Sequence, residues 1–176
     1  MIEIPQIPIG EVIVDIINFL RLNLAILFDI IRASISGTVE FFYSVLMLMP
    51  PILLIAIFAL ISWKVAKIKV AIFSIVSLAL IISMGLWEAT IQTLSLVLVA
   101  TIIALLIGLP LGILKARSKV FCTIIEPVLD IMQTLPSLSY LIPAVLLFRI
   151  GEVPGVIATV IFSMPPAIRL TSLGLE

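Results

Sequence analysis

The sequence ATIQTLSLVLVATIIALLIGLPLGIL, residues 89–114, runs for 26 positions without a charged side chain. A helix that crosses a bilayer needs about 20 predominantly apolar residues, with a range of about 17–25. This stretch therefore predicts a transmembrane helix. Gly108 and Gly112 lie four residues apart within it, a common spacing that lets two helices approach closely in lipid.

Four further stretches also lack charged residues, and they lie at residues 41–63, 70–87, 131–148 and 153–168. The last two are at the lower edge of the length criterion. Because proline fits the first turn of a helix but not its interior, we expect the first of these spans to begin near Pro51 and to end at Trp63 and Lys64. The chain is 63% hydrophobic and 11% charged, whereas a soluble domain is about half apolar and a quarter charged. We predict an all-α integral membrane protein with about five transmembrane helices.

The first 45 residues have a different pattern. One stripe recurs every three or four positions, with a gap at Leu22, and consists of Glu11, Asp15, Asn18, Ala25, Asp29, Arg32 and Ser36. Isoleucine and leucine fill the opposite side. This period predicts an amphipathic N-terminal helix that lies in the membrane interface or against the bundle. A sixth spanning helix is the alternative, although Asp15, Arg21 and Asp29 would be costly at mid-membrane.

Composition excludes several classes of function. The net charge is zero, so the chain has no basic signature for nucleic acid. It contains no histidine and a single cysteine, Cys122, so neither imidazole chemistry nor a thiolate metal cluster is available. No Gly-Lys-Ser/Thr phosphate loop is present. We therefore predict that the chain is not an enzyme and holds no cofactor or metal.

Lysine and arginine predict the orientation, because cytoplasmic connections carry an excess of them. The basic residues that gather between the predicted spans are Lys64, Lys67, Lys69, Lys115, Arg117 and Lys119, and Arg169 ends the last span. With five spans, all of these positions lie on one side. We predict a multi-pass protein of the cell (inner) membrane with these connections cytoplasmic and the N-terminus outside.

The fourth predicted span is irregular. Pro136 and Pro143 lie seven residues apart with polar side chains around them, which predicts a kinked or broken helix. Such backbone is tolerated in a membrane only where protein or a watery cavity satisfies it. The candidates for a translocation pathway or a gate are Asp130, Gln133, Thr134, Pro136, Tyr140 and Pro143. The Tyr140 ring could contact a cationic cargo through cation–π attraction, and ordinary packing is the alternative.

Two acidic residues precede this break. Glu126 and Asp130 are four residues apart and so share one helix face. A charge inside a span is functional by default. Here we favour a structural role, in which Glu126 and Asp130 form ion pairs with Lys119 or Arg169, and we keep direct gating as the alternative.

Six blocks in the second half carry a resemblance to a known family. They are QTLSLVL (92–98), IGLPLGI (107–113), PVLDIMQTLP (127–136), YLIPA (140–144), IGEVPGV (150–156) and IFSMPPAIRLTSLG (161–174). In this order they closely resemble the permease subunit of the glycine betaine/proline betaine importers, in the type I ABC importer class. The resemblance covers about residues 87–176, whereas residues 1–86 match only in layout.

This resemblance implies a division of the chain and a set of partners. Residues 46–86 would form two accessory transmembrane helices, and residues 87–176 the start of the permease core. Such permeases pair as homodimers in the membrane and bind cytoplasmic ATPase subunits. An extracytoplasmic substrate-binding protein delivers the osmolyte, and ATP hydrolysis in the partner subunit drives translocation.

The family's cytoplasmic coupling loop, with its Glu-Ala-Ala…Gly signature, is expected shortly after Leu173 and Gly174, and the sequence ends at Glu176. The sequence therefore looks like the N-terminal part of a permease, and a truncated gene, a partial sequence or a split permease would each fit. We expect residues 1–176 alone not to couple ATP hydrolysis to transport. A non-transporting membrane scaffold is the alternative function.

Overall fold

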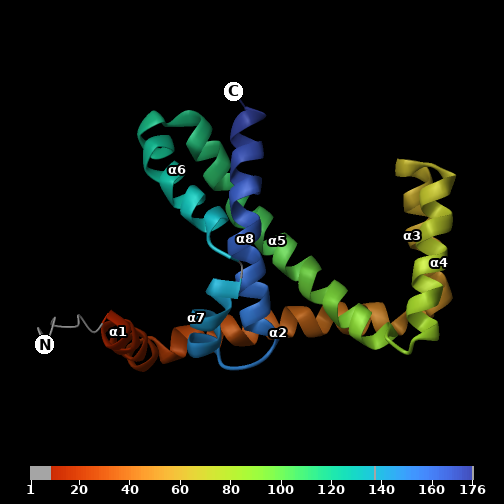
Figure 1. Ribbon diagram of the computed structural model, residues 1–176, viewed down its shortest axis with the longest axis horizontal. Coiled ribbons are helices and arrows are strands. Elements are labelled where there is room, and N and C mark those ends of the chain that lie inside the picture. Colours follow the sequence, from red (N-terminus) through yellow and green to blue (C-terminus); the bar gives the residue numbers. More distant parts are fainter. Residues whose placement is uncertain (1–8, 137, 176) are drawn as a thin grey trace, which may run out of the picture. The chain divides into compact units, whose positions relative to one another are not determined.

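The computed structural model describes residues 9–136 and 138–175, and in this part of the chain every regular element is an α-helix (Figure 1). The all-helical prediction is confirmed for these residues. Residues 1–8 of the predicted N-terminal segment lie outside them. The helices are α1 (Ile9–Asn23), α2 (Ala25–Leu48), α3 (Pro51–Ala66), α4 (Ile68–Ser83), α5 (Trp87–Arg117), α6 (Lys119–Thr134), α7 (Leu138–Phe148) and α8 (Glu152–Leu173).

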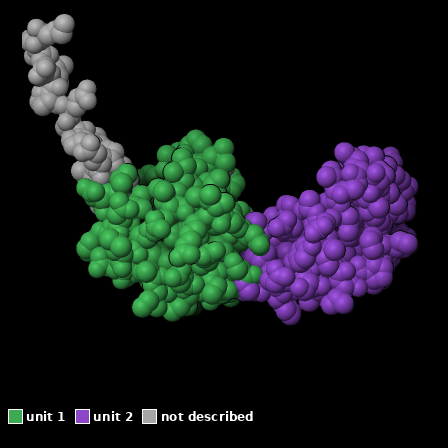
Figure 2. Space-filling model, turned by 90° about the horizontal axis from the view of Figure 1, so that it is seen from below, with its two compact units in different colours: residues 1–36, 100–176 green, residues 37–99 purple. Residues whose placement is uncertain are grey.

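Two compact units make up the chain (Figure 2). Unit 1 contains residues 1–36 and 100–176, and unit 2 contains residues 37–99. The long helices α2 and α5 each contribute residues to both units. The boundary at residue 100 falls inside the predicted segment 87–176, because the units follow helix packing, whereas the predicted segments follow composition and family layout.

Unit 2 contains a tight helical hairpin made by α3 and α4. Helix α3 begins at Pro51, as predicted, because a proline in the first turn loses no intrahelical hydrogen bond. A single residue, Lys67, connects the two helices with φ 72° and ψ 172°, a conformation that favours glycine. Leu54 and Ala71 are buried, and the hydroxyls of Ser62 and Ser74 hydrogen-bond at 3.0 Å across the hairpin.

Unit 1 is built around α8, which packs against α6 and α7 and also contacts α5. Val156 and Ile168 of α8 and Leu129 of α6 are among its most deeply buried side chains. A methyl group added at Gly112 of α5 would lie 2.5 Å from Cβ of Thr171, closer than two non-bonded carbon atoms approach in proteins. The glycine spacing noted in the sequence therefore marks a backbone-to-side-chain contact between α5 and α8 that a larger residue would not permit.

The N-terminal region differs from the single amphipathic helix that its sequence predicts. It forms two helices, α1 and α2, and the axes of residues 17–23 and of α2 differ by 83°. Asn23 ends α1, and its side-chain amide donates to the carbonyl of Phe19 at 2.8 Å. Contacts with the end of α7 hold the first half of α2, as Phe28 packs edge-to-face on Phe148.

The number of spanning helices depends on how the broken elements are counted. Among the described residues, α5 and α8 are long and apolar enough to cross a membrane, and the bent pairs α1/α2 and α6/α7 raise the number to four if each pair is one span. Helices α3 and α4 are apolar but have only 16 residues each. The predicted number of about five requires these two shorter helices to cross.

Candidate functional site

The predicted acidic residues lie on one face of α6. The helix begins after Ser118, whose hydroxyl oxygen accepts a hydrogen bond from the amide of Phe121 at 3.2 Å and so caps the first turn. Glu126, Asp130 and Gln133 follow at spacings of four and three, so their side chains share one face. The sequence of α6 therefore presents two carboxylates and an amide to whatever packs against this face.

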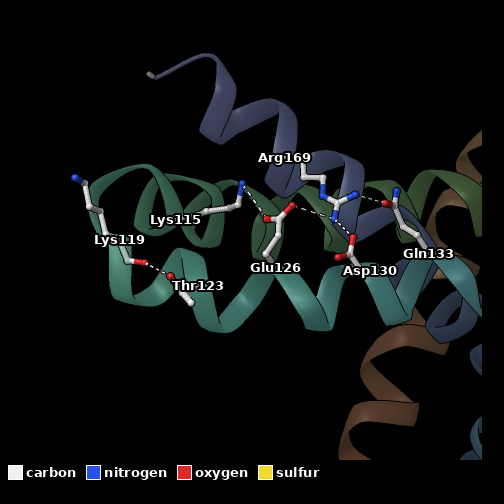
Figure 3. A network of polar contacts seen from close by, with 7 residues as sticks. All are labelled: Lys115, Lys119, Thr123, Glu126, Asp130, Gln133 and Arg169. Atoms are coloured by element: carbon white, nitrogen blue, oxygen red, sulfur yellow. Dashed lines mark hydrogen bonds and ion pairs between the residues drawn. The ribbon is translucent and has the colours of Figure 1, made fainter.

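Arg169 of α8 meets all three side chains (Figure 3). Its guanidinium donates to Asp130 Oδ1 at 2.5 Å and to Gln133 Oε1 at 2.5 Å, and it lies 3.1 Å from Glu126 Oε1. A planar guanidinium carries five N–H donors in a fixed fork, so one arginine can satisfy several acceptors at once. The structure thus brings together Glu126, Asp130 and Arg169, three residues that the sequence analysis selected for ion pairing.

The second cation of the cluster is Lys115, at the end of α5. Its ammonium lies 3.1 Å from Glu126 Oε2. Lys119, the other partner that the sequence suggested, points away from Glu126 (Figure 3), and its carbonyl accepts from the hydroxyl of Thr123 at 3.0 Å. Only Ser118 separates α5 from α6, so α6 folds back beside α5 and places Lys115 opposite Glu126. A short connection between two helices indicates that they pack antiparallel, and this was the feature of the sequence that could have pointed to Lys115 as a partner of Glu126.

We call these five residues the Arg169 cluster, and its members are Lys115, Glu126, Asp130, Gln133 and Arg169. It contains two cations and two anions, so its formal charge is zero. The four charged side chains are partly exposed, from 12% for Lys115 to 62% for Asp130. Each charged side chain therefore has an oppositely charged partner, and these contacts link α5, α6 and α8.

The remaining pathway candidates surround the break between α6 and α7. The axes of these helices differ by 97°, and Pro136 lies in the connection. Thr134 donates its hydroxyl hydrogen to the carbonyl of Ile131 at 3.2 Å, and Tyr140 donates to the carbonyl of Met132 at 3.0 Å. Pro143 lies inside α7 rather than at a second break. The two prolines therefore have different positions, one in the connection and one within a helix.

A groove between α7 and α8 is mostly apolar. It has a volume of about 310 Å³ and is lined by Leu138, Leu141, Gly155, Ala158, Thr159 and Phe162. The Thr159 hydroxyl donates to the carbonyl of Gly155 at 2.8 Å. The groove contains one aromatic ring, whereas quaternary ammonium groups are usually held by several rings.

An ion pair also joins α2 to the residue that follows α7. Arg149 lies 3.8 Å from Asp29, and both side chains are more than half exposed. Arg149 has a φ of 67°, which turns the chain after Phe148 toward α8. This pair could not be predicted from the sequence, because the two residues are 120 positions apart and neither belongs to a recognisable motif.

Residues 108–176 match the family described as the binding-protein-dependent transport system inner membrane component. This segment contains the whole Arg169 cluster and the break between α6 and α7. This part of the chain therefore resembles the membrane components of binding-protein-dependent transport systems, as the motifs of the second half implied.

Similarity to individual permeases of this kind extends along the full chain. The sequence is 38% identical to the glycine betaine transport system permease protein of Bacillus subtilis over 176 residues, which cover 100% of this chain and 62% of that protein. It is 44% identical to the glycine betaine/carnitine transport permease protein of Listeria monocytogenes, with coverage of 100% and 64%. It is 41% identical to the glycine betaine/proline betaine transport system permease protein of Escherichia coli, with coverage of 97% and 48%.

Two facts follow from these alignments. The chain spans about half to two thirds of the length of these relatives. The similarity also includes residues 1–86, for which the sequence motifs had indicated a match in layout only.

Proposed function

We propose that this chain forms part of the transmembrane permease of a type I ABC importer for osmolytes of the glycine betaine and proline betaine type. The observation that carries the proposal is the 38–44% identity, over all or nearly all of the chain, to three permeases whose names specify glycine betaine. ATP hydrolysis would take place in a separate cytoplasmic subunit. The further partners would be an extracytoplasmic substrate-binding protein and a second copy of the permease.

The proposed topology has five spans, namely α3, α4, α5, the bent pair α6/α7, and α8, with the N-terminus outside. Helices α3 and α4 are short, but Lys64 and Lys69 near their ends can extend toward the interface and lengthen the apolar stretch. Within unit 1, the connection between α5 and α6 lies at the same end as the C-terminus of α8, and the connection between α7 and α8 lies at the other end (Figure 1). This arrangement supports a cytoplasmic end that carries Lys115, Arg117 and Lys119.

Across the other end of unit 1 run α1 and the first half of α2 (Figure 1). This direction, transverse to α8, supports our proposal that they form an amphipathic segment in the outer interface. Apolar side chains such as Phe19 and Ile26 are exposed there, at 65% and 78%, and lipid would cover them.

Cysteine accessibility tests the topology. In a Cys122→Ala background, we expect Lys119→Cys to react with an impermeant maleimide only after the membrane is opened. Ile150→Cys, in the connection between α7 and α8, should react in intact cells. Both positions are exposed in the structure, so a difference in labelling would report sidedness. Equal labelling of both in intact cells would contradict the topology.

We retain Asp130, Gln133, Thr134, Pro136, Tyr140 and Pro143 as the candidates for the translocation pathway or the gate. Asp130 and Gln133 bind Arg169, and Tyr140 binds α6, so the contacts that would have to change during a transport cycle can be named. The bent α6/α7 pair is the element that we propose to move between transport states.

Uptake of labelled osmolyte tests the proposed function. Cells that lack their own osmolyte importers would express the complete permease together with its ATPase and binding protein. We expect uptake of glycine betaine that stops without either partner and that excess unlabelled proline betaine inhibits. Carnitine is the informative competitor, because one relative is named for it. Uptake that persists without the ATPase, or that betaines do not inhibit, would contradict the proposal.

A further inference from the structure

The proline in the break between α6 and α7 leaves the carbonyl of Met132 without its usual donor. In an α-helix, the carbonyl of residue 132 accepts from the amide of residue 136. Residue 136 is proline, which has no amide hydrogen. The preceding carbonyl, that of Ile131, does accept from the amide of Leu135 at 3.2 Å, so the regular pattern ends at Met132. In a membrane, a carbonyl without a partner is costly because no water is available to replace the missing donor.

The hydroxyl of Tyr140 occupies the place of the missing amide. It donates to the Met132 carbonyl at 3.0 Å and lies 3.3 Å from the Ile131 carbonyl. In a continuous helix, residues 132 and 140 would be about 12 Å apart along the axis, too far for this contact. The bond therefore forms only when α7 turns back on the end of α6, as it does here. The same proline that breaks the helix thus creates the acceptor that Tyr140 binds.

The last turn of α6 is held from a second side. Gln133, the neighbour of Met132, accepts a hydrogen bond from Arg169 of α8. Two consecutive residues of this turn are therefore bound by side chains from α7 and α8. Since α7 also packs along α8, the direction of α7 depends on both contacts.

We infer that Tyr140 is the positioning residue of this break, and that its hydroxyl sets the direction of α7 by replacing the amide hydrogen that Pro136 lacks. Its effect on transport rests on the proposed function, in which the α6/α7 pair lies beside the pathway. This role differs from a cargo contact through the Tyr140 ring, because it requires the hydroxyl and not the aromatic face.

Spin-label distances test this inference without any transport measurement. Labels at Ile124→Cys in α6 and Ile142→Cys in α7, two exposed positions, would report the angle between the helices in a Cys122→Ala background. In the purified permease in lipid nanodiscs, diluted with unlabelled protein, we expect one narrow distance distribution. Tyr140→Phe keeps the ring and removes the donor, so the distribution should shift or broaden. An unchanged distribution would overturn the inference.

Tyr43→Phe is the matched control. The Tyr43 hydroxyl also donates a hydrogen bond, to Glu88 at 3.1 Å, and this contact lies within unit 2. The same chemical change there should leave the α6–α7 distance unaltered. A similar shift in both variants would show a general loosening of the protein and would also overturn the inference.

Replacement of the proline provides a second, independent test. Pro136→Ala restores an amide hydrogen that can bond to the Met132 carbonyl. We expect Tyr140→Phe to lower the melting temperature by roughly 2–4 °C in the natural background, as the loss of one hydrogen bond would in a chain of this size. In the Pro136→Ala background it should have almost no effect. Equal effects in the two backgrounds would show that Tyr140 does not replace the missing donor.

Transport kinetics test whether the position of α7 that Tyr140 sets affects transport. We expect Tyr140→Phe to lower the maximal rate of betaine uptake about five-fold, the ratio that corresponds to one lost hydrogen bond, with little change in the apparent KM. Loss of a cargo contact would instead raise the KM. Normal uptake with altered spin-label distances would remove Tyr140 from the transport mechanism. Absence of betaine uptake in the natural protein would contradict the proposed function, and the distance experiment would still decide the role of Tyr140.

Discussion

The α3–α4 hairpin and the Arg169 cluster join helices in two different ways. The hairpin relies on buried apolar residues, a one-residue connection and one hydrogen bond between serines 12 positions apart. The Arg169 cluster joins α5, α6 and α8 through charged and amide groups, and Arg169 is 39 positions from Asp130. Lipid tails are as apolar as leucine, so apolar surface alone gives little drive for helices to associate in a bilayer. Neighbouring helices can depend on their connection, whereas helices distant in sequence need specific polar or close-packed contacts.

The largest effect that this comparison predicts is at the close contact between α5 and α8. Gly112→Ala places a methyl group 2.5 Å from Thr171 Cβ and 2.8 Å from the Ile168 carbonyl, so the helices must separate. We expect a loss of about 3 kcal/mol in the free energy of unfolding, near the upper end for overpacking. Thermal unfolding in detergent measures it.

Gly37→Ala is the matched control for this substitution. Gly37 lies in α2 with open space around its Cα, so the same change should raise stability by about 0.5–1 kcal/mol through helix propensity. A Gly112→Ala variant as stable as the natural protein would show that α5 and α8 do not depend on this contact.

The second largest loss of stability is expected at Arg169, the centre of the Arg169 cluster. Arg169→Ala leaves Glu126 with Lys115 as its ion-pair partner and removes the cation bound to Asp130. Because these side chains are only partly exposed, we expect a loss of about 2 kcal/mol, between the values for surface pairs and for buried pairs. Arg169→Lys should recover only part of this loss, since an ammonium cannot match the guanidinium fork.

Arg117→Ala serves as the control for Arg169. Arg117 is exposed and lies in the last turn of α5, near the Arg169 cluster in sequence but not among its five members, so its loss should cost less than about 0.5 kcal/mol. If both arginines gave the same small change in melting temperature, the cluster would not contribute to stability.

A smaller change, in this case a gain in stability, is expected at Lys67 in the connection between α3 and α4. Lys67 has φ 72° and ψ 172°, a conformation that costs a residue with a side chain about 1–3 kcal/mol. Lys67→Gly relieves this strain but gives the unfolded chain more freedom, so we expect a net gain of about 1 kcal/mol. Lys69→Gly, inside the first turn of α4, should destabilise instead. A destabilised Lys67→Gly variant would indicate that this connection is not strained.

The smallest effect should come from the hydrogen bond within the hairpin. Ser62→Ala removes the partner of Ser74, whose hydroxyl also bonds to the carbonyl of Val70 at 2.9 Å. Since Ser74 keeps this second bond, we expect a loss of only about 0.5 kcal/mol. A loss as large as that of Arg169→Ala would remove the distinction between the two regions.

The sequence predicted most of what depends on local patterns. Apolar length identified α5, proline chemistry identified the start of α3, and Pro136 identified the interruption between α6 and α7. Even the gap at Leu22 in the N-terminal stripe lies next to the position where α1 gives way to α2. Each of these features depends on residues that are close in sequence, so a local sequence pattern is enough to predict it.

Contacts between distant helices could not be predicted in the same way. The sequence suggested both Lys119 and Arg169 as partners for the acidic residues, and only the packing of α5 beside α6 shows that Lys115, not Lys119, faces Glu126. The bond from Tyr140 to Met132 depends on the angle of the break, which proline permits but does not specify. Neither of the two roles considered for Tyr140 from the sequence, packing or a cargo contact through the ring, indicates where its hydroxyl lies.

The shortness of α3 and α4 has a consequence for the lipid around them. A helix of 16 residues is about 24 Å long, whereas the hydrocarbon core of a bilayer is about 30 Å thick. If the pair crosses as proposed, the part of this mismatch that Lys64 and Lys69 do not cover is met by local thinning of the bilayer, at a cost of a fraction of a kcal/mol for each ångström. Lipids with short acyl chains would then collect beside the hairpin, and acyl-chain length would become a variable that controls the yield of active protein in reconstituted vesicles.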